Sequence, residues 1–86
     1  MESVRDLGAV VRERRTAQGL SQSALAVRAG VSREWVNSVE RGKPNVQLVP
    51  VFDLLAALDL RLSVVDREPH AEADALMEEL YGGDLA

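Results

Sequence analysis

Residues 19–43 read GLSQSALAVRAGVSREWVNSVERGK, and this stretch decides the fold. Two serines in it, Ser21 and Ser32, carry the kind of side chain that caps a helix N-terminus. Between them, Gly30 is the residue type that most easily takes the left-handed conformation at a helix end. The stretch therefore predicts two short helices joined by a tight turn that contains glycine, which is the helix-turn-helix arrangement.

Apolar spacing predicts one further helix on each side of this stretch. Upstream, Ser3 is a cap with Asp6 three residues on, and we expect a helix over about 4–17 that ends at Gly19. Downstream, Gly42-Lys43-Pro44-Asn45 breaks the chain, and a fourth helix follows. The residues expected to face the core in this fourth helix are Leu48, Val51, Phe52, Leu55 and Leu58.

After the fourth helix the pattern changes to period two. Leu60, Leu62 and Val64 then fall on one side, which predicts a strand over residues 60–65. A lone strand leaves its backbone groups unpaired, and the rest of the chain has no second β-like run. We therefore expect the same strand of a second copy to pair with it, which makes the protein a homodimer with a two-fold axis.

Length and composition exclude several classes of protein. The 86 residues make one small domain at most, so a large enzyme with a deep cleft is excluded. There is no cysteine, and therefore neither a disulfide framework nor a thiolate metal cage. The longest uninterrupted apolar run is 54–58, far short of the roughly 20 residues of a membrane span, and no leader opens the chain. We expect a cytoplasmic protein with no membrane partner.

The formal net charge of −4 is unevenly distributed along the chain. Residues 1–65 hold nine basic and seven acidic side chains, whereas residues 66–86 hold one basic and seven acidic ones. We therefore divide the chain into a helix-turn-helix domain over residues 1–66 and an acidic tail over 67–86, expected to be flexible or docked. The tail either serves solubility or offers a partner protein one apolar helix face, formed by Leu76, Met77, Leu80 and Tyr81.

Catalytic chemistry finds no support in the sequence. His70 is the only histidine, so no second histidine or cysteine exists to share a metal or to activate a nucleophile. We expect no catalytic residue, no metal and no cofactor.

The spacing of many residues carries a resemblance to a known family. The run Arg15-x3-Gly19-Leu20-Ser21-Gln22-x2-Leu25-Ala26-x2-Ala29-Gly30-Val31-Ser32-x3-Val36-x3-Glu40-Arg41-Gly42-Lys43 resembles the helix-turn-helix of Cro and cI-type repressors, the XRE family. The resemblance covers about residues 5–59 and implies an all-α, lambda-repressor-like domain of four to five helices. It also implies a structural salt bridge between Arg15 and Glu40, and a contact from the amide of Gln22 to the DNA backbone.

The end of the domain is similar to a narrower group. The run Leu54-Leu55-x2-Leu58-x-Leu60-x-Leu62 looks like that of HipB-type antitoxins. Such proteins pair through the C-terminal strand and bind both an operator and a toxin. The resemblance therefore implies a toxin partner, which in these systems is a HipA-like kinase.

The helix expected from Arg33 to about Arg41 has the features of a DNA recognition helix. Val36 and Val39 point inward, which leaves the N-terminal residues free for base edges in the major groove. Arg33 suits guanine, and Asn37 has the paired donor and acceptor that suit adenine. The residues predicted to contact DNA are Gln22, Ser32, Arg33, Glu34, Asn37, Ser38, Arg41 and Lys43.

Several of these residues have a plain structural alternative. Glu34 accepts from cytosine or orients Arg33, but an acid in the first helical turn is also favoured by the macrodipole alone. Asn37 and Ser38 suit a surface role as well as a DNA contact. Trp35 either packs against a neighbouring helix or donates its indole N–H to a phosphate. Arg12 and Arg14, on the first helix, either form a solvated face or place one of the two side chains against the DNA backbone.

The functional interpretation is a sequence-specific repressor that binds a palindromic operator in double-stranded DNA as a homodimer. As the antitoxin of a type II toxin–antitoxin pair, it would repress its own operon and neutralise the toxin. One alternative is a stand-alone repressor of the XRE family without a toxin partner. Another is a protein-interaction scaffold that has lost DNA binding.

Overall fold

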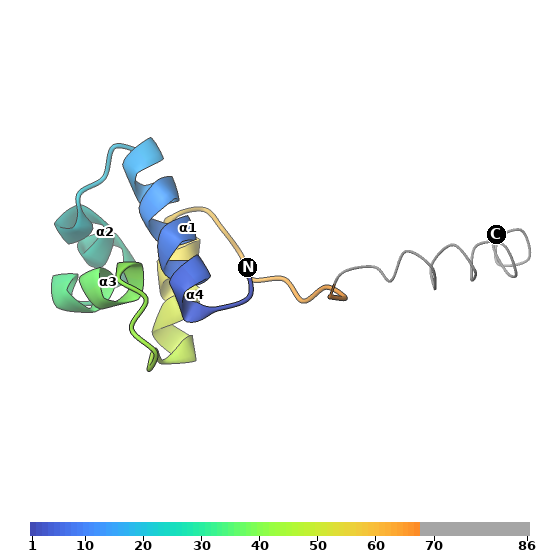
Figure 1. Ribbon diagram of the computed structural model, residues 1–86. Coiled ribbons are helices and arrows are strands. Elements are labelled where there is room, and N and C mark those ends of the chain that lie inside the picture. Colours follow the sequence, from blue (N-terminus) through green and yellow to red (C-terminus); the bar gives the residue numbers. More distant parts are fainter. Residues whose placement is uncertain (68–86) are drawn as a thin grey trace, which may run out of the picture.

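The computed structural model describes residues 1–67, which contain four helices (Figure 1). They are α1 (Val4–Ala17), α2 (Gln22–Ala29), α3 (Arg33–Glu40) and α4 (Leu48–Ala57). All four expected helices are confirmed, and α1 has the predicted bounds. Across residues 1–67 no helix is long and apolar enough to span a membrane.

The helix ends follow from capping side chains. Ser3 Oγ accepts a hydrogen bond from the amide of Asp6, and Ser21 and Ser32 cap α2 and α3 in the same way. Gly30 closes α2 in the left-handed conformation, with φ +72°. Each cap satisfies an amide that the first turn of a helix leaves unpaired. The turn between α2 and α3 is therefore as short as the sequence predicted.

The core lies where α1, α2, α3 and α4 meet, and it is built from aliphatic side chains. In Figure 1, α1 crosses in front of α4, and α2 and α3 lie together on one side of them. Packing pairs α3 with both α1 and α2, and α2 with α4. The side chains with no exposed surface are Val11, Leu25, Val36, Val39, Leu54 and Leu58.

At Gly8, α1 lies directly against the backbone of α3. A Cβ atom built at this position would collide with the backbone oxygen of Val39 and lie 2.9 Å from that of Glu40. Only a residue without a side chain permits this approach. The sequence pattern did not reveal this role of Gly8.

The inward face of α4 differs from the prediction. Val51, Leu54 and Leu55 are buried, and so is Leu58 just after the helix. The prediction that Leu48 and Phe52 face the core is wrong, because Leu48 is 57% exposed and Phe52 is 48% exposed. The helix is apolar on most of its circumference, so the apolar spacing fitted more than one face.

Residues 60–66 form neither helix nor strand in the single chain. Leu60, expected to face a second copy, packs instead against the core of its own chain. Leu62 and Val64 are exposed, at 42% and 95%. Pairing of residues 60–65 between two copies stays a prediction. The predicted apolar face of the tail, formed by Leu76, Met77, Leu80 and Tyr81, lies outside the described residues.

Candidate nucleic-acid interface

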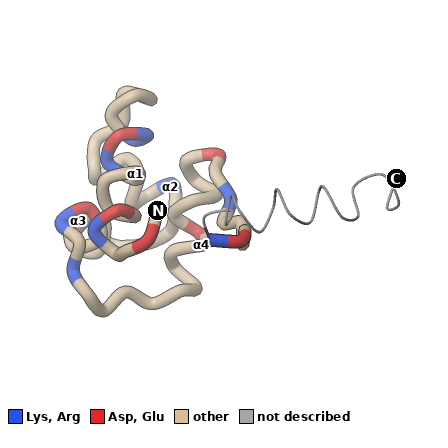
Figure 2. The backbone as a smooth tube through the Cα atoms, turned by 45° about the vertical axis from the view of Figure 1, so that its right-hand side comes forward, with Lys and Arg blue, Asp and Glu red and all other residues tan. Residues whose placement is uncertain are grey.

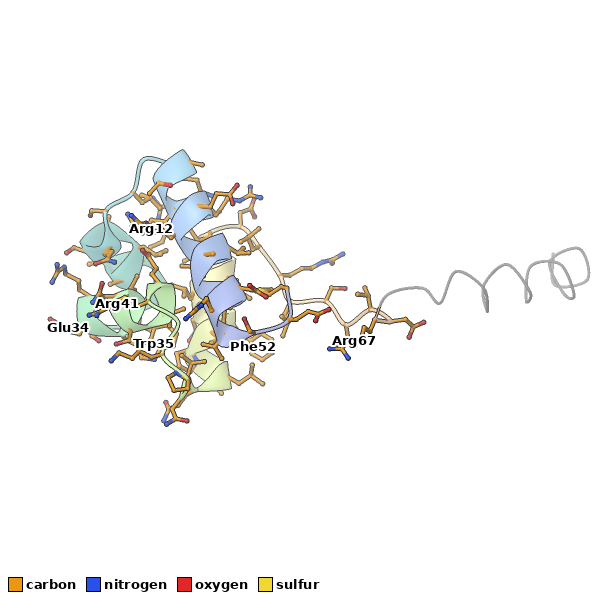
Figure 3. All side chains as sticks on the ribbon, in the orientation of Figure 1. Arg12, Glu34, Trp35, Arg41, Phe52 and Arg67 are labelled. Atoms are coloured by element: carbon orange, nitrogen blue, oxygen red, sulfur yellow. The ribbon has the colours of Figure 1, made fainter. Side chains whose placement is uncertain are left out.

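Helix α3 is anchored on one face and open on the other. Val36 and Val39 are fully buried, as predicted, and they fix the helix against α1 and α2. Arg33 and Glu34, in its first turn, are exposed, and Figure 3 shows the Glu34 side chain at the outer end of α3. The first turn of α3 thus presents a guanidinium and a carboxylate to solvent, where a ligand can contact them.

Four other predicted contact residues lie before, along or beyond α3 and differ in exposure. Ser32 is exposed and its Oγ accepts from the amide of Trp35 at 3.0 Å. Ser38 is half-buried, whereas Arg41 and Lys43, at the end of α3, are exposed. Trp35 packs against the hydrophobic core, which supports its packing role.

The predicted ion pair between α1 and α3 is confirmed. Arg15 Nε donates to Glu40 Oε2 at 2.7 Å and Arg15 Nη2 donates to Glu40 Oε1 at 2.9 Å. The two side chains are only 12% and 4% exposed. The hydrogen bonds to Glu40 raise the pKa of Arg15, against the opposing effect of burial. These hydrogen bonds therefore favour the charged form of Arg15.

Gln22 links this ion pair to Asn37 by hydrogen bonds. Its Nε2 donates to Glu40 Oε1 at 3.3 Å and to Asn37 Oδ1 at 3.2 Å. Sequence reasoning treated Gln22 and Asn37 as separate contacts to DNA and did not foresee that they bond to each other. The spacing of 15 residues gives no periodic signal, because the contact depends on how α2 crosses α3.

These side chains border an open polar pocket of about 240 Å³ between α1 and α3. The residues around it are Arg12, Arg15, Gln22, Asn37, Glu40 and Arg41. Three arginines and one glutamate give the pocket a formal net charge of +2. Figure 2 shows basic residues on α1, α2 and α3 and on the segments that follow α3 and α4. Of the predicted DNA contacts, the structure thus brings together Gln22, Asn37 and Arg41, and adds Arg12.

A second surface is apolar and belongs to α4 and the segment that follows it. Leu48, Val49 and Phe52 are exposed on α4, as are Leu62, Val64 and Val65 beyond it. Leu48 and Leu62 also border an open groove of about 380 Å³ that Met1, Val4 and Leu7 help to form. We call these six exposed side chains the α4 apolar surface.

Comparisons with known proteins agree with this arrangement. A sequence model described as a helix-turn-helix domain matches residues 6–72. The chain is 37% identical over 60 residues to an uncharacterized HTH-type transcriptional regulator, y4mF, of Sinorhizobium fredii. That match covers 70% of this chain and 79% of the relative.

Solved structures add two further similarities. The restriction-modification controller protein C.AhdI from Aeromonas hydrophila is 46% identical, with a TM-score of 0.63 over 67% of this chain and 84% of that one. A chain of the HipA-HipB-O2-O3 complex is 25% identical, with a TM-score of 0.73 over 79% of this chain and 96% of that one. The protein therefore belongs to the helix-turn-helix domain family, and within it to the XRE type.

Proposed function

We propose that this protein is a sequence-specific DNA-binding repressor that acts as a homodimer on a two-fold symmetric operator. The observation that carries the proposal is that α3 is buried on its inner face and exposed at its first turn. Its inner face is locked by two fully buried valines, and its first turn exposes Arg33 and Glu34. A helix held in this way can enter the major groove with its N-terminal side chains directed at base edges.

The α4 apolar surface supports the dimer. Exposed apolar side chains that share a groove, as Leu48 and Leu62 do, are typical of an interaction site. Pairing of residues 60–65 with a second copy would cover Leu62 and Val64 and satisfy the backbone groups of that segment. Two α3 helices related by a two-fold axis would then lie about 34 Å apart, one turn of duplex.

Operator selection from random duplexes tests the DNA-binding proposal. We expect the selected sites to be palindromic, and Arg33→Ala to weaken operator binding by about 1–3 kcal/mol. The same variant should blur the preference at one base pair of each half-site. Arg28→Ala, at an exposed arginine of α2 that is not among the predicted contacts, serves as the control. Unchanged affinity of Arg33→Ala for every sequence would show that α3 is not the recognition helix.

Proline substitutions test the paired strand. A proline removes a backbone donor, so at one of two successive positions it deletes a ladder hydrogen bond. We expect proline at Ser63 or at Val64 to shift sedimentation from dimer to monomer. A dimer that persists with proline at each position contradicts the strand pairing, while operator binding by that dimer would leave the DNA-binding proposal standing.

We further propose that the repressor is the antitoxin of a toxin–antitoxin pair. The similarity to a chain of the HipA-HipB-O2-O3 complex supports this role, since it extends over 79% of the chain. A controller of a restriction–modification system is the second candidate, because the identity to C.AhdI is higher, at 46%.

The tail and the adjacent gene distinguish the two roles. Deletion of residues 69–86 should leave operator binding intact and abolish the complex with a co-encoded toxin. A neighbouring reading frame for a kinase-like toxin favours the antitoxin. A neighbouring restriction endonuclease or methyltransferase gene favours the controller instead.

A further inference from the structure

The polar pocket between α1 and α3 combines positive charge with a fixed hydrogen-bond direction. Arg12 and Arg41 are exposed at its rim, and in Figure 3 both side chains extend to the side of α1 where α3 lies. Deeper in the pocket, Glu40 is neutralised by Arg15, so its charge does not oppose an incoming anion. The pocket is thus complementary to a small anionic group.

The buried ion pair sets the direction of the hydrogen bonds. An ionised carboxylate only accepts, so the groups that face Glu40 must donate. Gln22 therefore turns its Nε2 inward, where one hydrogen is directed to Glu40 and the other to Asn37 Oδ1. As a result the amide oxygen of Asn37 is already bonded, and its Nδ2 group is left to meet a ligand.

This arrangement changes what Asn37 can recognise. Pairing with the edge of adenine needs both a donor and an acceptor from the same amide. The bond from Gln22 occupies one of the two lone pairs of Asn37 Oδ1, whereas the Nδ2 donor keeps both of its hydrogens for DNA. A donor beside two arginines matches the oxygens of a backbone phosphate, which accept hydrogen bonds and carry negative charge.

We propose that this pocket binds one backbone phosphate of the DNA, with Asn37 donating to a phosphate oxygen and Arg12 and Arg41 supplying the positive charge. This inference rests on the proposed function, since it takes the α3 face to be the one that meets DNA. It assigns to Arg12 the contact with the DNA backbone that the sequence left open between Arg12 and Arg14. It also moves Asn37 from base reading to backbone positioning, with Gln22 holding its amide in place.

Asn37→Asp is the sharpest variant. It keeps an oxygen for Gln22 but replaces the outward donor with a carboxylate that faces the phosphate. Because a hydrogen bond to a charged group is lost, we expect affinity to fall by about tenfold or more, equally for operator and for arbitrary duplex. Asn37→Ala should give a smaller, equally uniform loss. A change of preference at one base pair, with unchanged binding to arbitrary duplex, would overturn the proposal and make Asn37 a base reader.

Arg12→Ala tests the charge, with Arg14→Ala as the matched control from the same helix. Both arginines are exposed, and only Arg12 borders the pocket. We expect Arg12→Ala to reduce the log–log dependence of affinity on salt by about 0.9, and Arg14→Ala to leave it near the wild-type value. Equal slopes for the two variants would overturn the assignment of Arg12.

Neutral methylphosphonate linkages, placed one at a time in the operator, locate the contact. One linkage should weaken the wild-type protein, with little further effect on Arg12→Ala. Losses that add at every linkage would contradict the phosphate site.

Arbitrary duplex separates this inference from the proposed function. If no operator is selected but Arg12→Ala still lowers the salt dependence, the repressor fails and the phosphate site stands. If Asn37→Asp and Arg12→Ala both bind a selected operator as the wild-type protein does, the phosphate site fails and the repressor stands.

Discussion

The part of the chain up to the end of α3 and the part from α4 onward differ in what they show to solvent. The outward side chains of α1, α2 and α3 are mostly charged or polar, with Val10 and Val27 as the large apolar exceptions. From Leu48 onward, six large apolar side chains are exposed within 18 residues. We call these two parts the polar half and the apolar half. One small core thus supports two unlike sets of exposed side chains, one mostly charged or polar and one apolar.

Within the polar half, we expect the largest loss of stability when Glu40 is replaced. Glu40→Ala would leave Arg15 as a buried charge with the backbone oxygen of Leu20, at 2.8 Å, as its remaining hydrogen-bond acceptor. Because an unpaired buried charge is costly, we expect the free energy of unfolding to fall by about 3–5 kcal/mol. Urea unfolding followed by circular dichroism measures it.

The double variant Arg15→Met with Glu40→Leu is the control for this loss. Replacement of a buried ion pair by apolar side chains of similar volume is often close to neutral, so the double variant should be far more stable than Glu40→Ala. If the single variant loses less than about 1 kcal/mol, the pair is not what orders the polar half.

Within the apolar half, helix α4 carries both buried and exposed apolar side chains. Leu54 is fully buried and Val49 is 74% exposed, on the same helix. We expect Leu54→Ala to cost about 2–5 kcal/mol, because it removes core contacts and leaves a cavity. Val49→Ser should change the stability of the dilute monomer by less than about 0.5 kcal/mol. Similar losses for both variants in thermal unfolding at low concentration would mean that the α4 apolar surface is part of the core of the single chain.

Gly8 holds the polar half together, since it lets α1 lie against α3. Gly8→Ala should destabilise the protein by about 3 kcal/mol, because the added methyl meets backbone oxygens that cannot rotate away. Ala9→Ser, one residue on and exposed, is the matched control and should be nearly neutral. A melting temperature for Gly8→Ala equal to that of the control would show that α1 has room to shift.

The sequence predicted the parts of the molecule that local chemistry determines. Ser3, Ser21 and Ser32 indicated three helix starts because a serine hydroxyl bonds to an amide three residues away. Gly30 indicated the turn because left-handed backbone favours glycine. The Arg15–Glu40 pair was anticipated from the family resemblance alone, since 25 residues separate the two side chains.

What the sequence could not predict depends on how the helices cross. The apolar pattern of α4 fits several faces, so Leu48 and Phe52 were placed in the core although they are exposed. A glycine inside a helix reads as a weak point, and only the approach of α3 gives Gly8 its role. The bond from Gln22 to Asn37 likewise joins two helices, so no local rule predicts it.

The smallest effect we expect concerns the start of α1, at the edge of the polar half. The backbone amide of Glu2 donates to Asp6 Oδ2 at 3.0 Å, and this bond lowers the pKa of Asp6. The folded pKa thus lies below the unfolded one, so the stabilisation is complete above the unfolded pKa and is lost as pH falls through the folded pKa. Between about pH 5 and pH 2, the wild-type protein should therefore lose slightly more stability than Asp6→Asn, whose side chain does not titrate. Melting temperatures across this range measure the difference, and parallel curves would mean that the bond to Glu2 does not persist in solution.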